Sequence, residues 1–365
     1  MGDISSSMGK NSSGVTPKLV CGLDLGDKKS HVCVCIAEGE VLERAKIDTT
    51  EPGLARYFQN RAPMRIALET GTHSPWVSRL LRRWGHEVLV ANPRKVRLIG
   101  NSRRKNDRLD ALSLADLASV RPRLLYPVEH VTAQAQADRG VLRSRDALVQ
   151  ARARLILHTR GLVKAQGGRL PSCSAESFAK KVKPLVPTAL APALLPMLSQ
   201  IAELSTTIRG YDKQIQELIR TRYPQAEKLQ QINGVGPITA LAFVLCLGDP
   251  KRFSKSRQVG AYLGLVPAQR DSGQSTPQMR ISKEGNPYVR RLLMQCAQYI
   301  LGPFGEDSDL RRFGERLAAL GGGKTPKKRA IVAVARKLSV VMHRLLVTQQ
   351  PYQPLLHGAE LQAAA

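Results

Sequence analysis

Four carboxylates in the N-terminal part of the chain have the residue type and placement for metal-dependent chemistry on phosphate esters. Asp24 interrupts the apolar run at residues 19–25, and Glu69 ends a second apolar run. Asp107 and Asp110 are three residues apart, so on a helix they share one face. Carboxylates brought together repel each other unless cations hold them, and hard oxygen ligands suit Mg²⁺ or Mn²⁺. Two such ions activate a nucleophile and stabilise the leaving oxygen in phosphodiester cleavage.

The segments around these acids predict a mixed α/β domain. Two short runs, at residues 19–25 and 31–37, are rich in β-branched residues and flank a Gly-Asp-Lys-Lys break, which is typical of a β-hairpin. The alternation that follows indicates three antiparallel strands and then strands joined by helical crossovers. A right-handed crossover would place Asp24 and Glu69 at the same edge of the sheet. The later expected elements are strands 41–47, 64–69 and 87–91 and helices 52–60, 74–84 and 107–118.

Each acid taken singly also fits a plainer role. Asp24 fits a solvated strand end, and Asp107 follows Asn106 at the start of a helix, where either residue fits a capping role. The metal site is predicted from the four acids jointly, in a strongly basic chain, and not from any one of them.

Composition indicates a nucleic-acid partner. The chain has 365 residues, enough for two or three domains, and carries 56 Lys and Arg against 29 Asp and Glu, a formal charge of +27. Such an excess favours a polyanion, because phosphate neutralisation releases counterions. The charge is spread over the whole length and no run reaches eighteen apolar residues, so we expect neither membrane binding nor a transmembrane helix.

The N-terminus and the cysteines suggest a cytoplasmic protein. Residues 1–17 are rich in Ser and Gly without an apolar core, which predicts a disordered leader and not a signal peptide. The six cysteines match no zinc spacing, and Cys33 and Cys35 would lie on one strand face without pairing. We interpret all six as reduced core residues.

The middle of the chain predicts two long helices. Residues 133–164 repeat Leu, Val and Ala at helical spacing and also carry basic residues such as Arg152 and Arg154, which form either a solvated face or a surface that follows phosphates. Residues 167–196 are broken by Gly and Pro and predict a linker, after which a second helix begins. Its apolar residues alternate spacings of four and three, a coiled-coil seam that pairs within the chain or with another subunit. The predicted seam is Met197, Ile201, Leu204, Ile208, Tyr211, Ile215 and Leu218.

The C-terminal part predicts a mainly helical domain with phosphate-binding groups. Gly234 and Gly236 join two helical stretches in the manner of a helix-hairpin-helix, although glycine turns between helices are also common without DNA contact. The segment at residues 253–291 is dense in polar groups suited to phosphate. A basic run at residues 324–329 fits nucleic-acid binding or a solvated linker, and a helix at residues 330–347 precedes a tail that we expect to be disordered.

Three N-terminal motifs resemble a known family. They are Gly22-Leu-Asp-Leu-Gly26, Leu68-Glu-Thr-Gly71 and Asn106-Asp-Arg-Leu-Asp-Ala111. They are similar to motifs of the RuvC-like, DEDD-type domain of the RNase H fold, in particular that of insertion-sequence transposases of the IS-one-ten family, eleven-eleven subgroup. The resemblance implies that Asp24, Glu69, Asp107 and Asp110 bind the metal.

Further motifs resemble the transposase domain of the same family. They are Gly264-Leu-Val-Pro267, the Asp-Ser-Gly at residues 271–273 and Ile281-Ser-Lys-Glu-Gly-Asn286. In that family the serine of the Ser-Gly pair is the nucleophile, which places this role on Ser272. Ser275 and Ser282 are rival candidates, and an ordinary turn residue is the plainer role for Ser272. Serine needs a base or a metal to activate it, and no histidine lies near it in sequence. Metal ions held by the first domain could activate Ser272 instead, and the active site would then be assembled from two domains.

The resemblance covers nearly the whole chain and implies a recombinase that excises and inserts an insertion sequence through a phosphoserine intermediate. It further implies a structured noncoding bridge RNA that guides donor and target double-stranded DNA, and a homo-oligomer, either a dimer or a tetramer. Two alternatives remain: a metal-dependent junction resolvase or nuclease that uses water, and a non-enzymatic nucleic-acid scaffold.

The expected domains are a leader (1–17), a RuvC-like domain (18–122), a helical linker with coiled coil (123–227), a transposase domain (228–350) and a tail (351–365). The expected nucleic-acid contacts are Arg103, Arg104, Lys105, Arg152, Arg154, Gly234, Gly236, Arg270, Lys283 and Arg290.

Overall fold

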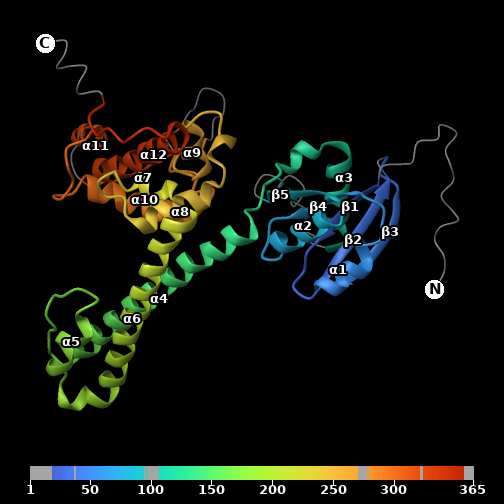
Figure 1. The fold of residues 1–365 in the computed structure, drawn as a ribbon. Helices are drawn as coiled ribbons and strands as arrows, with labels where there is room; N and C mark the ends of the chain where they lie inside the picture. Colours follow the sequence, from blue (N-terminus) through green and yellow to red (C-terminus); the bar gives the residue numbers. More distant parts are fainter. Residues whose placement is uncertain are drawn as a thin grey trace, which may run out of the picture. The chain divides into compact units, whose positions relative to one another are not determined.

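The computed structural model describes residues 19–36, 38–93, 96, 107–269, 277, 279–320 and 324–356. The chain divides into two compact units, residues 1–133 and 134–365, and each is described by itself (Figure 1). The predicted leader at residues 1–17 lies outside the described residues, as does the tail beyond residue 356.

The first unit is built on a five-stranded mixed sheet in the order β3-β2-β1-β4-β5. β1, β2 and β3 are antiparallel neighbours, whereas β4 runs parallel to β1 and β5 runs parallel to β4. This arrangement confirms the expected three antiparallel strands and the parallel neighbours β1 and β4. The strands are β1 (Leu19–Asp24), β2 (Lys29–Ile36), β3 (Val41–Asp48), β4 (Arg65–Glu69) and β5 (Glu87–Ala91).

Helices cover both faces of this sheet. Successive side chains of a strand point to opposite faces. Cys21 and Leu23 pack with Leu54 and Leu81, from α1 and α2, whereas Val20 packs with Leu114 of α3 on the other face. The sheet is therefore enclosed between two layers of helix. The helical elements of this unit are α1 (Glu51–Phe58), α2 (Ser74–Arg83), α3 (Asp107–Val120) and the short 3₁₀ helix η2 (Pro122–Leu125).

The second unit begins with two long helices that run antiparallel within one chain. α4 (Ala133–Ala165) and α6 (Ala191–Arg222) lie side by side in Figure 1. Contacts such as Arg145–Asp212 and Thr159–Met197 join residues whose numbers rise along α4 and fall along α6, as antiparallel packing requires. Between the two helices lie α5 (Phe178–Val182), η3 (Lys183–Leu185) and η4 (Thr188–Leu190).

α6 corrects two details of the expected coiled coil. The helix begins at Ala191 and not after residue 196: Pro192 lies in the first turn, where no amide donor is needed, and Pro196 is tolerated inside the helix. Four residues of the predicted seam are buried (Ile201, Ile208, Ile215 and Leu218), whereas Met197, Leu204 and Tyr211 are not, and the other buried positions include Ser205 although that residue is polar. Its hydroxyl donates to the Ile201 carbonyl at 2.8 Å, so burial leaves no unmade hydrogen bond there. The buried residues of α6 are Leu194, Leu198, Ile201, Ser205, Ile208, Ile215, Leu218 and Ile219.

The rest of the second unit is a helical bundle around α8 (Pro237–Leu247), in which every residue from Thr239 to Leu247 is buried. α12 begins at Lys324, six residues earlier than expected, because Pro326 lies in the first turn and breaks no helical hydrogen bond there. The basic run at residues 324–329 is thus helical. The remaining elements are α7 (Gln225–Leu229), η5 (Pro250–Arg252), α9 (Arg257–Tyr262), α10 (Pro287–Ile300), α11 (Asp309–Ala319) and α12 (Lys324–Thr348).

The cysteines behave largely as expected. All six are free thiols, and five of them are buried, whereas Cys173 is half-buried. Cys33 and Cys35 lie on the sheet face that α3 covers, with their sulfur atoms 3.9 Å apart. Burial raises the pKa of the Cys35 thiol to about 12, so it is neutral at physiological pH. In the described part of the chain, no helix combines the length and the apolar character needed to cross a bilayer.

Candidate active site

Asp24 and Glu69 are the last residues of two adjacent parallel strands. β1 and β4 pair with Leu23 opposite Leu68, so the residue that follows in each strand lies at the same, carboxyl edge of the sheet. This register confirms the expectation that the two acids share an edge. Asp24 is half-buried and Glu69 is exposed, and both are already engaged in polar or electrostatic contacts.

The same two acids also share a face of the sheet. Alternation places Asp24 with Val20 and Gly22, and places Glu69 with Ala67; Val20 and Ala67 belong to the core that α3 covers. Both carboxylates therefore lie on the α3 face, at the carboxyl ends of their strands.

α3 brings the other two acids toward this edge. A Cβ atom at Gly22 would lie 1.8 Å from the Ala111 carbonyl oxygen, so the start of α3 rests directly on β1. Asp110, which is exposed, immediately precedes Ala111, and Asp107 is the first residue of the helix. The side chain of Asp107 lies outside the described part of the structure. The fold thus brings the segments that carry all four acids to one region.

This all-carboxylate set fits a hard divalent cation. Asp24, Glu69 and Asp110 come from three different elements, and with Asp107 they would hold Mg²⁺ or Mn²⁺ by oxygen ligands alone. Among the described side chains, no three acidic, His or Cys residues are already grouped closely enough to hold a metal ion. The metal role of the four acids stays a prediction.

His31 is a neighbour of this site that the sequence did not single out. It is the register partner of Asp24 across the antiparallel pair of β1 and β2, and it lies on the same sheet face as Cys33 and Asp24. Directly opposite residues in such a pair have Cβ atoms roughly 5 Å apart, within reach of an imidazole and a carboxylate. The hairpin pattern together with strict alternation was the available signal, but the register had to be known.

A second histidine joins two loops at the same edge. The His73 Nε2 atom lies 3.6 Å from Asp27 Oδ1, which connects the loop after β4 with the β1–β2 turn. The Trp76 indole donates to His73 Nδ1 at 3.1 Å, which assigns the ring proton to Nε2, facing Asp27. This chain of contacts positions the loops on either side of Asp24 and Glu69.

The segment around Ser272 is framed by a small antiparallel ladder in the second unit. The Ser282 amide donates to the Val266 carbonyl at 2.8 Å, and the Ala268 amide donates to the Arg280 carbonyl at 2.9 Å. Ser272 itself lies outside the described residues, and so do Arg103, Arg104, Lys105, Arg270 and Ser275. Among the rival serines, Ser282 is described: its hydroxyl accepts a long hydrogen bond, 3.4 Å, from the Glu284 amide.

Two glycines of the resembling motifs are required by this framework. Gly264 has φ +67°, and a Cβ there would lie 2.2 Å from the Glu284 carbonyl oxygen. Gly285 has φ +74°, and a Cβ there would lie 2.0 Å from the Tyr262 carbonyl oxygen. Positive φ and this close approach both exclude a side chain. The two motifs therefore interlock through their main chains.

The Arg290 side chain links the same two motifs by hydrogen bonds. Its Nη1 atom donates to the Leu263 carbonyl at 2.9 Å and to the Glu284 carbonyl at 2.8 Å. This accounts structurally for an arginine at residue 290, and its contact with nucleic acid stays a prediction. Lys283 is exposed with φ +56°, and its amide donates to the Gly264 carbonyl at 3.2 Å; contact of its side chain with nucleic acid stays a prediction.

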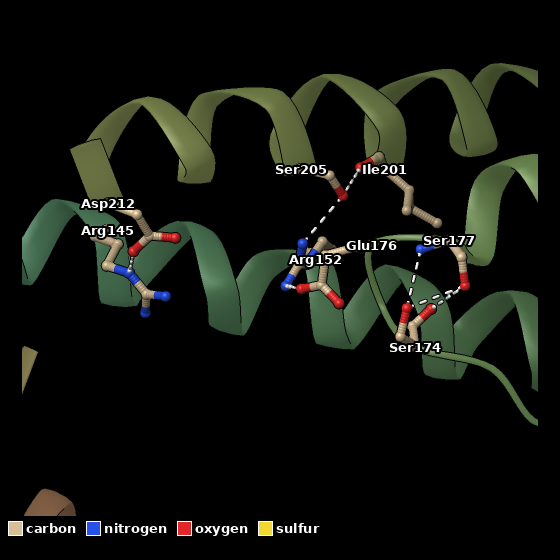
Figure 2. A network of polar contacts seen from close by, with 8 residues as sticks. All are labelled: Arg145, Arg152, Ser174, Glu176, Ser177, Ile201, Ser205 and Asp212. Carbon is tan, nitrogen blue, oxygen red and sulfur yellow. Dashed lines mark hydrogen bonds and ion pairs between the residues drawn. The ribbon is translucent and has the colours of Figure 1, made fainter. Parts of the chain in front are cut away.

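Arg152 corrects the expectation of a phosphate-contacting helix. Its side chain points from α4 toward α6 (Figure 2), and the residue is only 5% exposed. Nη1 donates to Ser205 Oγ at 3.1 Å, and Nη2 pairs with Glu176 at 2.8 Å. Nucleic-acid contact is thus wrong for Arg152, because the residue is buried and its Nη1 and Nη2 atoms are used by Ser205 and Glu176 within the second unit. Arg154, two residues on, is exposed and remains a candidate.

The glycines of the expected helix-hairpin-helix differ in their surroundings. Gly234 has φ +88°, and a Cβ there would lie 2.8 Å from the Tyr299 ring, so packing against α10 requires glycine. Gly236 is exposed and caps α8. The turn is therefore explained by packing at Gly234, and DNA contact at either glycine stays a prediction.

Comparisons with known proteins agree with this architecture. A transposase family model for DEDD transposases of the IS110 type matches residues 21–165, and a model described as "Transposase IS116/IS110/IS902 family" matches residues 226–308. The transposase for insertion sequence element IS1328 of Yersinia enterocolitica is 31% identical over 284 residues, covering 76% of this chain and 82% of that protein. A probable family 20 transposase of Pseudomonas aeruginosa is 29% identical, covering 90% and 94%. The transposase for insertion sequence element IS1111A of Coxiella burnetii is 27% identical, covering 92% and 91%.

The mixed sheet with acids at its carboxyl edge fits a DEDD transposase domain of the RNase H-like class. The chain belongs to the IS116/IS110/IS902 family of transposases, which are enzymes that cleave and transfer DNA strands. Its DEDD domain implies the use of divalent metal ions in general.

Proposed function

We propose that this transposase cleaves DNA with Ser272 as its nucleophile, and that Asp24, Glu69, Asp107 and Asp110 hold Mg²⁺ or Mn²⁺ beside the scissile phosphate. The observation that carries the metal half of this proposal is the register of β1 and β4, which puts Asp24 and Glu69 on one face at one edge, under the start of α3. The serine half rests on the motif resemblance around residues 264–286 and on the interlocked glycines that frame that segment.

The proposed step exchanges one phosphodiester for another. The Ser272 Oγ–phosphorus bond forms, the bond from phosphorus to a deoxyribose oxygen breaks, and that oxygen takes up a proton equivalent to the one the serine loses. Attack by a deoxyribose hydroxyl of another strand reverses the exchange and regenerates the serine. Bound divalent ions would lower the pKa of the attacking hydroxyl and stabilise the leaving oxygen. Because the acids and Ser272 lie in different units, the proposed site is composite.

The finer features of the proposal follow from the resemblance and the charge. We propose that a structured noncoding bridge RNA directs donor and target double-stranded DNA, and that the protein acts as a homo-oligomer, either a dimer or a tetramer. A formal charge of +27 is compatible with binding both nucleic acids. The long helix pair of α4 and α6 forms within one chain, so pairing between subunits would use another face of these helices.

Covalent trapping tests the nucleophile. Labelled substrate DNA is incubated with the protein, and the mixture is denatured and separated by size; we expect a protein–DNA adduct that Ser272→Ala abolishes and Ser275→Ala, the matched control, retains. Glu69→Gln should remove cleavage while DNA binding remains. Cleavage by Ser272→Ala at the normal rate without an adduct would instead support the water-using nuclease.

A further inference from the structure

One face of α12 lines a groove and carries alternating basic and apolar turns. The opposite face is buried in the core through residues such as Val334, Leu338 and Met342. On the groove face, basic turns at residues 328–329 and 336–337 flank a half-buried apolar turn at residues 332–333. At 1.5 Å per residue, the two basic turns are about 12 Å apart along the helix. A second apolar turn and a third cation follow: Val340, Val341 and Arg344.

This face forms the floor of a groove of about 1800 Å³. One wall comes from α11, where Phe313 is half-buried and the Lys337 Nζ atom lies 4.5 Å from its ring centroid. The other wall comes from α9 and from the ladder at residues 265–267 and 279–283. The groove therefore lies entirely within the second unit.

The groove is strongly basic. Among the described residues that line it, Asp309 is the single acid, and it accompanies eight cations. Such a set favours a polyanion. The cations are Arg257, Arg280, Lys283, Lys328, Arg329, Arg336, Lys337 and Arg344.

We propose that this groove binds single-stranded DNA, with phosphates on the basic turns of α12 and unpaired bases against the apolar turns and Phe313. A duplex hides its base faces and would gain nothing from Val332, Val340 or Val341 between the cations. Single strands, in contrast, bind basic grooves that also offer apolar or aromatic surfaces to their bases. This combination of charge and apolar surface distinguishes the groove from a uniformly basic surface.

The place of the groove indicates which strand it holds. Pro267, Met279, Arg280 and Ile281 line it, and they belong to the two sides of the ladder between which the segment with Ser272 runs. A strand in the groove would thus lie beside the ladder whose two sides precede and follow Ser272 in the sequence. This assignment to the DNA strand next to the cleaved bond, rather than to RNA, rests on the proposed function; single-strand binding itself does not.

Fluorescence anisotropy of the full-length protein tests the groove. The probes are a 12-nucleotide oligothymidylate, the same length carrying abasic residues, a duplex and an oligouridylate. We expect Lys328→Gln/Arg336→Gln to weaken binding of the oligothymidylate by about tenfold or more and duplex binding much less. The abasic probe should bind wild-type protein about tenfold more weakly than the intact strand, because it offers no base to stack.

The matched control removes two exposed positive charges elsewhere. Arg209→Gln/Lys213→Gln, on α6, should leave binding of the oligothymidylate within about twofold, since these residues lie outside the groove. Equal losses in both double variants, equal binding of the abasic probe, or tighter binding of the oligouridylate would overturn the proposal. Because Ser272→Ala and Glu69→Gln should bind the strand normally, failure of the cleavage mechanism and failure of the groove are distinguishable.

Discussion

Gly22 in β1 lies directly beneath the main chain of Ala111 in α3, where a Cβ atom would be 1.8 Å from the Ala111 carbonyl oxygen. Asp110 precedes Ala111, and Asp24 lies two residues beyond Gly22 on the same sheet face. The close approach of helix and strand at this glycine therefore sets the separation of acids that come from distant parts of the chain.

Gly22→Ala should displace the start of α3 and separate the acids. We expect a loss of about 1–3 kcal/mol in the free energy of unfolding, because the added methyl group overpacks a main-chain contact. DNA cleavage should fall further than this loss of stability explains, while DNA binding is kept. Urea denaturation and a cleavage assay on the same preparation measure both.

Gly210→Ala is the control for that substitution. Gly210 is exposed in α6, and a Cβ there would meet nothing within 4 Å. Alanine should raise the stability by up to about 1 kcal/mol, since it favours the helix interior more than glycine does. Wild-type cleavage by Gly22→Ala would show that the contact with Ala111 does not position the acids.

The sheet and the shared edge of Asp24 and Glu69 could be predicted because their signals are local. Alternating apolar residues identify strands, and the handedness of crossovers then orders them. The register that places His31 opposite Asp24 was not predictable in the same way. It depends on how many residues form the turn at Leu25–Lys28, and a shift by one residue would turn His31 to the other face.

The burial of Arg152 and the early start of α12 could not be predicted from the sequence, for a different reason. Arg152 lies among many arginines of a helix, and its partner Ser205 is 53 residues away, so no local pattern marks it as internal. Pro326 resembles a helix breaker unless the helix is known to begin two residues before it. In both cases the deciding contact or boundary is set by tertiary packing.

Ser205→Ala should destabilise the helix pair, because it leaves the buried Arg152 Nη1 donor without its hydroxyl acceptor. We expect a loss of about 1–3 kcal/mol in the free energy of unfolding, measured by urea denaturation. The double variant Arg152→Met/Ser205→Ala should recover part of this loss, since it removes the buried donor as well. A double variant no more stable than Ser205→Ala would contradict the assigned contact.

Substitutions of Arg152 and Arg154 should differ in their effects on nucleic-acid binding. Arg154→Gln removes an exposed charge and should weaken binding of duplex DNA modestly, with a smaller salt dependence. Arg152→Met should leave that salt dependence unchanged, because the arginine is already paired inside the protein. Titrations at several salt concentrations measure the slopes, and equal slopes for the two variants would contradict the buried role.

Glu43 should contribute to stability at neutral pH and lose that contribution in acid. Hydrogen bonds from Arg61, and a further one from Tyr57, hold the pKa of this carboxyl below its usual value of 4.5. The unfolded chain binds the proton first as pH falls, so the contribution is complete above the unfolded pKa and declines as pH falls through the lowered folded pKa. Glu43→Gln should unfold with a shallower pH dependence below about pH 4.5. The same change at the exposed Glu40 is the control, and identical slopes for all three proteins would exclude this role.

His31 should act as a positioning residue for Asp24. Its imidazole faces the same side of the sheet, directly across the β1–β2 pair, so removing it should let the Asp24 carboxylate move from the orientation in which it would bind a cation. We expect His31→Ala to raise the Mg²⁺ concentration needed for half-maximal cleavage several-fold, with thermal stability and DNA binding near those of the wild type. Lys46→Ala changes the next residue across the sheet, opposite His31 and farther from Asp24, and should leave the Mg²⁺ requirement unaltered. If His31→Ala cleaved more slowly at every Mg²⁺ concentration but with an unchanged half-maximal value, the histidine would not act through Asp24.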